Sequence, residues 1–348
     1  MNKRLGFDEV CTHIFNAKPD AFHYYGRKAK SYIEQARNCF AENLNVYFSE
    51  LYFSGNSLQQ SISLIQVLLL FSDVKDIYLN PFEQNDFLEY LNIFAEKEKL
   101  NLHFLNVDKQ GVFDLKELQA LLSKQQSKSL LYLSHATEYS GILIPVKEIK
   151  KICETTGTLF FLNLKSTIGK YEIKLNTLLP DFASIDLSEH NGCLNTGVFF
   201  MKQSVQLSDF SFHRIKKHLK INETKDVHLI CQLSESFKYL YSNIDLYAAH
   251  IHSIQDYFIR QFGKYLGLKH VSASYHKKGI YSYLSYFFPE KKFGKYLAEK
   301  LDMQNIVCEK ISYPFNEEAG TYIRFSFGKD NSEKDVDYLI QILKSLGK

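Results

Sequence analysis

The sequence TLFFLNLKSTIGKYEIKLNTLLPDFASIDLSEHNGCLNTGVFFMK, residues 158–202, decides the fold. It contains three short, largely apolar runs at 158–164, 181–187 and 197–202, which are separated by a loop and by a glycine-containing turn. The runs are nearly continuous in apolar residues and do not alternate with polar ones. Strands that are buried on both faces of a sheet have this pattern. The stretch therefore predicts strands inside a sheet that is covered on both sides.

Upstream of residue 158, similar strands alternate with amphipathic helical segments. A regular alternation of strand and helix favours a mostly parallel sheet with helices on both faces. We therefore predict an α/β domain over this part of the chain. The expected strand and helix pairs are 46–53 with 57–71, 76–80 with 86–99, 102–107 with 114–122, and 129–135 with 146–157.

The pattern changes near Asp226, where a long helical region extends to about residue 266. With 348 residues, the chain is long enough for two domains. We expect a large domain over 14–245 and a small α+β domain over 246–348, with residues 1–13 packing on the small domain. The elements expected beyond the helical region are strands at 281–288, 305–311 and 321–327, and helices near 292–301 and 332–346.

The composition is that of a globular protein without a strong charge bias. Hydrophobic residues make up 45% of the chain, and 42 basic and 39 acidic residues leave a net charge of +3. No nucleic-acid-binding surface is indicated, and the basic run at 214–220 predicts a solvated helix face. The apolar run Leu64–Phe71 is too short to cross a membrane, and the first residues do not resemble a signal peptide. We therefore expect a cytoplasmic protein that binds neither a membrane nor a nucleic acid.

Few local motifs indicate chemistry. The six cysteines are scattered without a CxxC pair, so neither a metal site nor a disulfide framework is predicted. The segment FSGNS, 53–57, combines a strand end, a glycine turn and a helix start, whose N–H groups could cradle a phosphate. Ser57 as a plain N-cap is an equally good interpretation. His135 follows a predicted parallel strand at the edge where sites collect, although such a histidine is more often structural.

Several segments resemble, in the same order, the cysteine desulfurase branch of the class V aminotransferases, which are pyridoxal-phosphate (PLP) enzymes of fold type I. KPDAFHYYGRKAK resembles the family's NPSSxHxxGR segment, and FSGNS resembles its TSGAT phosphate turn. DFASIDLSEHNGCLNTGVFFMK resembles DFxSFSGHKxxGPxGxGxLYxR, and TYIRFSFGKDNSEKDVDYLIQIL resembles IRxSxGRxxTxEExD. The resemblance covers nearly the whole chain. It implies a mostly parallel mixed sheet flanked by helices, plus a small C-terminal α+β domain.

The resemblance also assigns residues to the cofactor site, and most of them lack the family's chemistry. The lysine of the Schiff base falls on Glu189, or on Asn191 in an alternative register, and neither side chain can form an imine. The aspartate at the pyridine nitrogen falls on Asn163, and the histidine stacked on the ring falls on Gln84. A phosphate-binding serine falls on Asp186, whose charge would repel a phosphate.

Other family-equivalent positions are less altered. Arg324 matches the arginine that grips the substrate carboxylate, and Cys308 lies near the start of the family's cysteine loop. An ordinary strand cysteine is the favoured interpretation of Cys308. The remaining equivalents are Gly55, Asn56 and Ser57 in the phosphate turn, Thr137 and Glu138 at an asparagine pair near the ring, and Ser188 at the histidine before the lysine.

The resemblance therefore favours a catalytically inactive homologue, homodimeric like its relatives, which binds a protein partner or a small molecule in a binding or regulatory role. Covalently bound PLP is not expected, and neither another cofactor nor a metal is predicted. Two alternatives stay open. One is an active PLP enzyme, a desulfurase or an aminotransferase, with Lys165 as a displaced lysine. The other is a PLP-independent ligand binder whose cleft holds an acidic cluster, made of His135, Glu138, Asp186 and Glu189.

Overall fold

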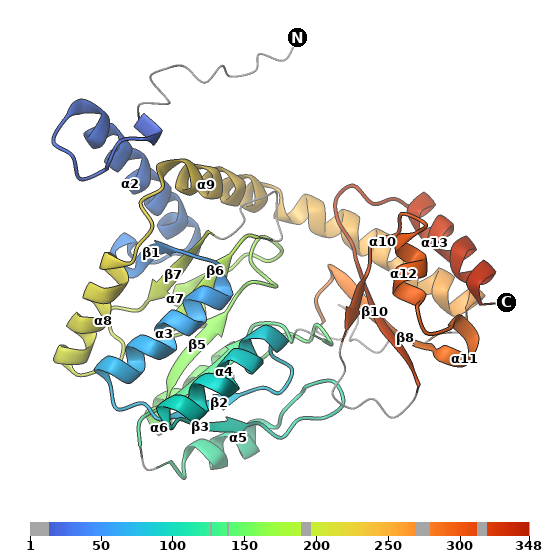
Figure 1. Ribbon diagram of the computed structural model, residues 1–348, viewed down its shortest axis with the longest axis horizontal. Coiled ribbons are helices and arrows are strands. Elements are labelled where there is room, and N and C mark those ends of the chain that lie inside the picture. The colour runs from blue at the N-terminus through green and yellow to red at the C-terminus, as the bar shows by residue number, and fades with distance from the viewer. Residues whose placement is uncertain are drawn as a thin grey trace.

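The computed structural model describes residues 14–125, 127–137, 139–188, 196–266, 268, 279–311 and 319–347. Within these residues the largest feature is a seven-stranded sheet with the order β1-β7-β6-β5-β4-β2-β3 (Figure 1). Strands β2 to β6 run parallel, whereas β7 is antiparallel to both of its neighbours, β6 and β1. The mostly parallel mixed sheet is therefore confirmed. The strands are β1 Leu51–Ser54, β2 Asp76–Leu79, β3 Asn101–Phe104, β4 Ser129–Ser134, β5 Leu159–Asn163, β6 Phe182–Asp186 and β7 Gly197–Met201.

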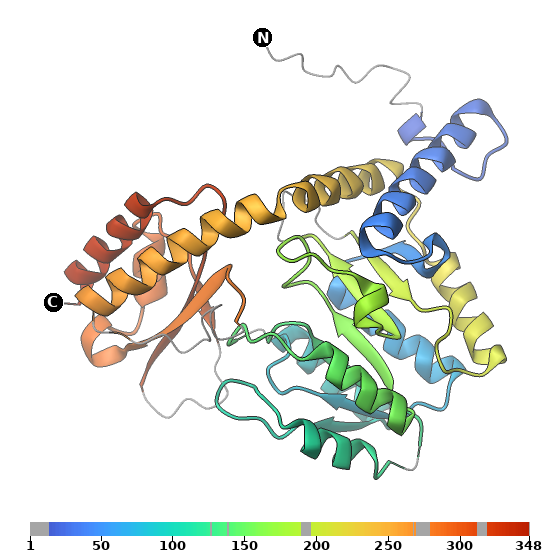
Figure 2. The ribbon, with the colours of Figure 1, turned by 180° about the vertical axis from the view of Figure 1, so that it is seen from behind.

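Helices cover both faces of this sheet (Figures 1 and 2). In β5, Phe160 and Leu162 belong to one hydrophobic core, and Leu159 and Phe161 belong to the other. Because successive side chains of a strand point to opposite faces, both sets must be apolar. This arrangement explains the continuous apolar runs. The first core includes α2 Tyr24–Leu44, α5 Leu115–Leu122, α6 Val146–Thr156, α7 Leu175–Leu178 and α9 Val227–Ser242, and the second includes α3 Ser57–Phe71, α4 Asn85–Glu98 and α8 Asp209–Ile221.

The first predicted strand is shorter than the sequence indicated. Residues 46–50 do not join the sheet, because Phe48–Glu50 forms a 3-10 turn, η1, and β1 begins only at Leu51. The buried Glu50 carboxylate stabilises this turn by accepting hydrogen bonds from the backbone N–H groups of Tyr47 and Gln203 at 3.0 and 2.8 Å. The apolar letters before Leu51 thus belong to the turn and not to the strand.

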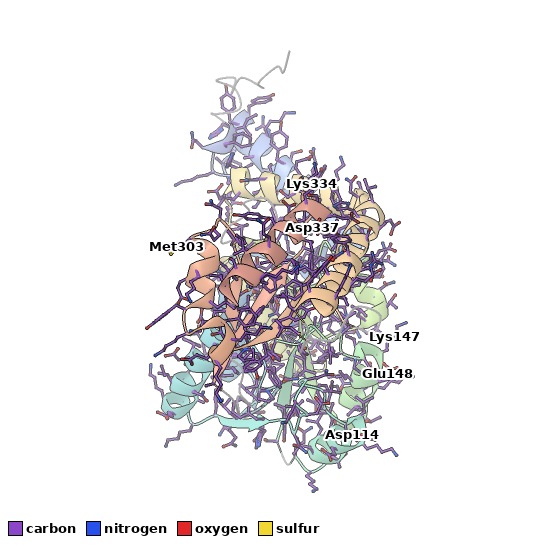
Figure 3. All side chains as sticks on the ribbon, turned by 90° about the vertical axis from the view of Figure 1, so that its right-hand side faces the viewer. Asp114, Lys147, Glu148, Met303, Lys334 and Asp337 are labelled. Atoms are coloured by element: carbon purple, nitrogen blue, oxygen red, sulfur yellow. The ribbon has the colours of Figure 1, made fainter. Side chains whose placement is uncertain are left out.

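A second, antiparallel sheet with the order β8-β10-β9 lies beside the first. Its elements surround a separate aromatic core that includes Phe258, Tyr286 and Phe325. Figure 3 views this part end-on, with Lys334 and Asp337 exposed on the outer face of α13. The elements are α10 Ile244–Tyr265, β8 Tyr283–Pro289, α11 Glu290–Phe293, α12 Leu297–Asp302, β9 Glu309–Ile311, β10 Gly320–Ser326 and α13 Glu333–Leu346.

Two predicted elements in this region are corrected. The helix expected near 292–301 is divided into α11 and α12, because Gly294 adopts a φ of 78°, which a helix cannot include. The strand expected at 305–311 contains only Glu309–Ile311, and Cys308 precedes it. The helix boundary depends on the backbone angle of Gly294, and the strand boundary depends on which residues pair with β10.

Hydrogen bonds connect the small sheet with the loop that follows β4 in the large sheet. The hydroxyl of Tyr283 donates to the carbonyl oxygen of Thr137 at 3.0 Å, and that of Ser285 donates to the carbonyl oxygen of Tyr139 at 3.2 Å. The division into 14–245 and 246–348 remains a prediction. In the described parts of the chain, no helix has both the length and the apolar character that crossing a membrane requires.

Candidate functional site

The carboxyl ends of the parallel strands bring the predicted site residues to one edge of the large sheet. Ser134 ends β4, Asn163 ends β5 and Asp186 ends β6. Strand β1 runs in the same sense as β6, because β7 is antiparallel to both, so the turn after Ser54 opens at this edge as well. Ligands of open α/β sheets bind at such edges. The structure thus gathers residues that are far apart in the sequence.

The turn 55–57 leads into α3, and its polar groups are bound within the protein. Asn56 is the N-cap of α3, and its side chain accepts a hydrogen bond from the N–H of Gln59 at 3.0 Å. One carboxylate oxygen of Asp186 accepts the N–H of Ser57 at 2.8 Å, and the other accepts the N–H of Ser188 at 2.8 Å. The prediction that Ser57 is an N-cap, which was the alternative to a phosphate contact, is wrong. Asn56 is the N-cap, and Ser57 is the first residue of the helix.

Asp186 is 1% exposed, so its charge lies at the N-terminus of α3 away from water. A helix N-terminus carries unsatisfied N–H groups and a partial positive charge, both of which stabilise an anion there. A side-chain carboxylate of the chain itself therefore supplies the anion at this helix end. The backbone packs tightly around it, since a Cβ on Gly197 would come within 2.5 Å of the carbonyl oxygen of Ile185 and 3.0 Å of that of Gly55.

Asn163 is 7% exposed and its amide is held by three partners. Its Oδ1 accepts hydrogen bonds from the N–H of Lys165 and the hydroxyl of Ser184, both at 3.0 Å. Its Nδ2 donates to the hydroxyl of Tyr132 at 3.2 Å, and that hydroxyl lies 3.1 Å from the hydroxyl of Ser61 in α3. A continuous polar network therefore connects the ends of β4, β5 and β6 with α3.

A buried carboxylate that sequence reasoning missed lies at the neighbouring strand end. Glu83 is 5% exposed and accepts hydrogen bonds from both the N–H and the hydroxyl of Ser134, the former at 2.9 Å. Gln84 follows it as the N-cap of α4 and is partly exposed. Only the proximity of Glu83 to the predicted site residue Gln84 could have drawn attention to it in the sequence.

His135 is a neutral histidine under ordinary conditions. Its Nδ1 lies 2.9 Å from the hydroxyl of Thr167, and burial lowers the pKa of its imidazole to about 4. Thr137, two residues further, is 4% exposed, and its hydroxyl accepts the N–H of Ile142 at 3.0 Å. The contact of His135 therefore joins the loops after β4 and β5, whereas that of Thr137 lies within the loop after β4. The structural interpretation of His135 agrees with its contact.

Arg324 projects from β10 and is bound within the small sheet. Its guanidinium forms an ion pair with Glu309 and lies over the ring of Tyr283, 4.8 Å from the ring centroid. Cys308 precedes Glu309 and is half-buried. Burial, together with the nearby carboxylates of Asp302 and Glu299, raises the pKa of its thiol to about 11. The thiol is therefore protonated at neutral pH, which disfavours nucleophilic chemistry.

Glu189, Asn191 and Glu138 lie outside the described residues. The acidic cluster that was predicted as one alternative therefore has only His135 and Asp186 within the described part of the chain. Among the described residues, no group of three or more histidine, cysteine or acidic side chains is arranged to hold a metal ion.

The family model described as "Aminotransferase class-V" matches residues 8–339. The chain belongs to this family. As a class V aminotransferase-family member, it is 21% identical over 347 residues to a cysteine desulfurase IscS from Dictyoglomus turgidum, covering 94% of this chain and 86% of the relative. A solved structure titled "NIFS-LIKE PROTEIN" matches with a TM-score of 0.82 and 20% identity over 97% of this chain and 95% of that one.

A second solved structure, a NifS-like protein from Rickettsia africae, has a TM-score of 0.77 and 20% identity, and the match covers 97% of this chain and 95% of that one. These structural likenesses show the fold. The predicted resemblance to the cysteine desulfurase branch is confirmed, and the fold of the PLP-dependent enzymes is confirmed with it.

Proposed function

We propose that this class V aminotransferase-family member is a catalytically inactive homologue that keeps the scaffold for a binding or regulatory role. The observation that carries the proposal is the buried Asp186 carboxylate at the N-terminus of α3, bonded to the N–H of Ser57. The family uses PLP, and the resemblance assigns this turn to the phosphate of that cofactor. The anion of this turn is instead a side chain of the protein.

The electrostatics of this position do not fit a phosphate. Two like charges about 4 Å apart repel each other by roughly 4 kcal/mol at an effective dielectric constant of about 20. A phosphate dianion beside Asp186 would experience this repulsion and would also lose the N–H of Ser57 as a donor. The turn therefore supports phosphate binding poorly, although its backbone has the right shape.

The ring position does not fit the cofactor either. PLP acts as an electron sink when a carboxylate keeps its pyridine nitrogen protonated. Asn163 carries no charge, and its amide is already bonded to the N–H of Lys165, to Ser184 and to Tyr132. Gln84, at the position of the stacked histidine, has no aromatic ring. These residues support a protein that no longer uses the cofactor.

The substrate position carries an internal partner as well. The resemblance assigns Arg324 to a substrate carboxylate, but its guanidinium pairs with the carboxylate of Glu309. A carboxylic acid substrate would compete with this contact. Both anion positions of the family thus have a carboxylate of this chain beside them, which favours a non-catalytic role.

The proposal is tested by incubating the purified protein with PLP, reducing it with borohydride and mapping adducts by mass spectrometry. We expect no stoichiometric pyridoxyl adduct on any lysine, because Glu189 or Asn191 stands where the family has its lysine. A cysteine desulfurase treated in parallel is the positive control. A stoichiometric adduct on Lys165 would instead establish the alternative of a displaced lysine.

The proposal includes a homodimer, since two-fold dimers are the commonest arrangement of oligomeric proteins. Aromatic side chains at the start of α2 support an apolar contact: Phe22 is 97% exposed, Tyr24 is 54% exposed, and the ring of Tyr24 contacts that of Tyr25. We expect light scattering at micromolar concentration to give twice the mass of one chain. A monomer mass under these conditions would contradict the dimer.

A further inference from the structure

A groove between α2, η1 and α8 is separate from the residues assigned to the cofactor. Its volume is about 740 Å³, and it is lined by residues from both helices and from the start of β1. The turn 55–57 lies at the other end of β1, and none of the cofactor-equivalent residues that the structure describes lines the groove. Figures 1 and 2 show α2 and α8 at the end of the large sheet that lies away from β8 and β10. We call it the basic groove, after its cationic residues Lys30, Arg37, Lys216, Lys220 and Lys225.

Two of these cations are already paired within the protein. The guanidinium of Arg37 lies 2.8 Å from the carboxylate of Glu223, and the same carboxylate accepts the N–H of Phe53 in β1 at 2.8 Å. The ammonium of Lys225 pairs with Asp20. These contacts hold the walls of the basic groove together, so they contribute to its shape more than to its net charge.

Among the described residues that line the groove, three further lysines and one further carboxylate remain. Lys30 comes from α2, Lys216 and Lys220 come from α8, and Glu34 is the acidic residue of the lining outside the two ion pairs. The positive field reaches neighbouring groups: Lys225 holds the pKa of the Asp20 carboxyl below its usual range, and Lys30 and Lys220 add to this effect. The basic groove therefore has an excess of positive charge after its internal pairing.

Apolar side chains accompany the charges. Leu51, Tyr52 and Ile33 are buried in the lining, and Phe48 is 60% exposed beside them. A surface that combines cations with an exposed aromatic ring suits an acidic segment with one apolar anchor residue. A free inorganic anion would use the charges and leave Phe48 uncovered.

We infer that the basic groove binds an acidic segment of a partner protein, with carboxylates at the three lysines and an apolar residue against Phe48. The sequence predicts that the basic run at 214–220 is a solvated helix face. The residues next to this run in the sequence do not indicate that it lies near α2 in the fold. The fold brings Lys216 and Lys220 into one groove with Lys30, which is about 190 residues away in the chain. Oppositely charged surfaces steer the association of two proteins and fix the register of the contact.

The inference names a partner class for the binding role proposed above and rests on that role. Its failure is distinguishable from the failure of the proposed function. A PLP adduct would contradict catalytic inactivity and would leave the basic groove unchanged, because the two sites share none of the residues that the structure describes. Absence of peptide binding would remove the partner and leave the argument from Asp186 intact.

The test uses a fluorescein-labelled peptide of about a dozen residues that contains several glutamates and one leucine, with binding to the full chain followed by anisotropy. A peptide with glutamine in place of every glutamate is the control. We expect the acidic peptide to bind at least about tenfold more tightly, and its affinity to fall as salt screens the lysines. Equal binding of both peptides would overturn the inference.

Charge-reversal variants locate the contact. The triple variant Lys30→Glu, Lys216→Glu and Lys220→Glu should weaken binding of the acidic peptide at least about tenfold. The matched control reverses exposed lysines elsewhere: Lys147→Glu and Lys151→Glu, which have the same spacing on α6, and Lys334→Glu on α13 (Figure 3). The control variant should bind the acidic peptide within about twofold of the unmodified protein, because substitutions at distant sites act independently of the groove.

Three further outcomes would overturn the inference. The control variant weakens binding as much as the groove variant, or a short DNA duplex binds more tightly than the acidic peptide, or the groove variant changes the oligomeric mass in light scattering. The last result would make the basic groove a contact between copies of this chain. If the triple variant does not fold, judged by circular dichroism, the corresponding lysine-to-glutamine variant replaces it, with an expected loss of about fivefold.

Discussion

His135 lies at the carboxyl end of β4 with its Nδ1 beside the hydroxyl of Thr167, and burial lowers the pKa of its imidazole to about 4. In the unfolded chain the pKa is about 6.5. Between these two values the unfolded state binds more protons than the folded state, so stability rises with pH over this interval. The contribution is complete above about pH 6.5 and is lost as the pH falls toward 4.

We predict that lowering the pH from about 7 to about 5 destabilises the protein through His135 by about 2 kcal/mol, measured as free energy of unfolding in urea. The variant His135→Gln cannot take up this proton and should have a smaller decrease over the same interval. Its hydrogen-bonding side chain can still reach Thr167. If the variant and the unmodified protein lose the same free energy of unfolding between these pH values, the imidazole of His135 is not buried and neutral.

At the same scale, the contacts of single residues were the least predictable part of the site. The sequence indicated that Asp186 would repel a phosphate, but not that its carboxylate binds the N–H of Ser57, because 129 residues separate the two. Glu83 was missed because a buried glutamate has no local signature in the sequence, and its partner Ser134 lies on another strand. Such contacts depend on how strands are ordered in the sheet.

Elements were predicted better than contacts. The helix 57–71 has the predicted bounds, because a capping residue, Asn56, precedes it and Ser72 ends it in an extended conformation. The strand predicted at 46–53 was too long, since apolar letters alone do not distinguish β1 from the turn η1. The strands of the parallel core were predicted well because burial on both faces leaves continuous apolar runs.

The connection between α6 and β6 depends on a buried ion pair. The ammonium of Lys150 lies 2.9 and 3.0 Å from the carboxylate oxygens of Asp181, which also accepts the N–H of Phe160 at 2.9 Å. The two charged side chains are 7% and 6% exposed. Removing one charge from such a pair leaves the other uncompensated in a medium of low dielectric constant. Glu154, at 3.9 Å, is half exposed and compensates only weakly.

We predict that Asp181→Asn lowers the free energy of unfolding by about 3–5 kcal/mol in urea titrations. Adding Lys150→Met to this variant should recover part of the loss, because the unpaired ammonium is then gone and the asparagine oxygen still accepts the N–H of Phe160. The matched control is Asp330→Asn, which breaks the exposed pair with Lys329 and should cost less than about 1 kcal/mol. A double variant less stable than Asp181→Asn would contradict this account.

At the scale of the whole molecule, the chain has the fold of its family, and our proposal is that this scaffold no longer carries the family's chemistry. The mostly parallel mixed sheet, its two layers of helices and the small second sheet were predicted from the sequence, whereas the order of the strands comes from the structure. Residues that the resemblance assigns to the cofactor and the substrate have partners within the chain: Asp186 with Ser57 and Asn163 with Tyr132 at the carboxyl edge, and Arg324 with Glu309 in the small sheet. A protein that satisfies these groups internally has less need of a ligand to stabilise them.

The residue assignments at this edge can be tested by restoring the family's chemistry. We predict that Glu189→Lys combined with Asn163→Asp gives measurable PLP binding with a visible imine absorbance. The lysine supplies the amine, and the new carboxylate favours a protonated pyridine nitrogen through a charge-assisted hydrogen bond. An aspartate at 163 can keep the local network, because its oxygens accept the N–H of Lys165 and the hydroxyl of Ser184, and the hydroxyl of Tyr132 can donate to it.

Adding Asp186→Ser to this double variant should tighten PLP binding at least about tenfold, because it removes a like charge from the phosphate position, and one such repulsion at about 4 Å amounts to roughly 4 kcal/mol. It also leaves the N–H of Ser57 available to the phosphate. Absorbance titration with PLP measures both effects, and the single variant Asn191→Lys serves as the control for register. An imine band in that control alone would move the lysine position by two residues. A triple variant that folds but has no imine band at millimolar PLP would show that Asp186, Asn163 and residue 189 do not surround one cofactor site.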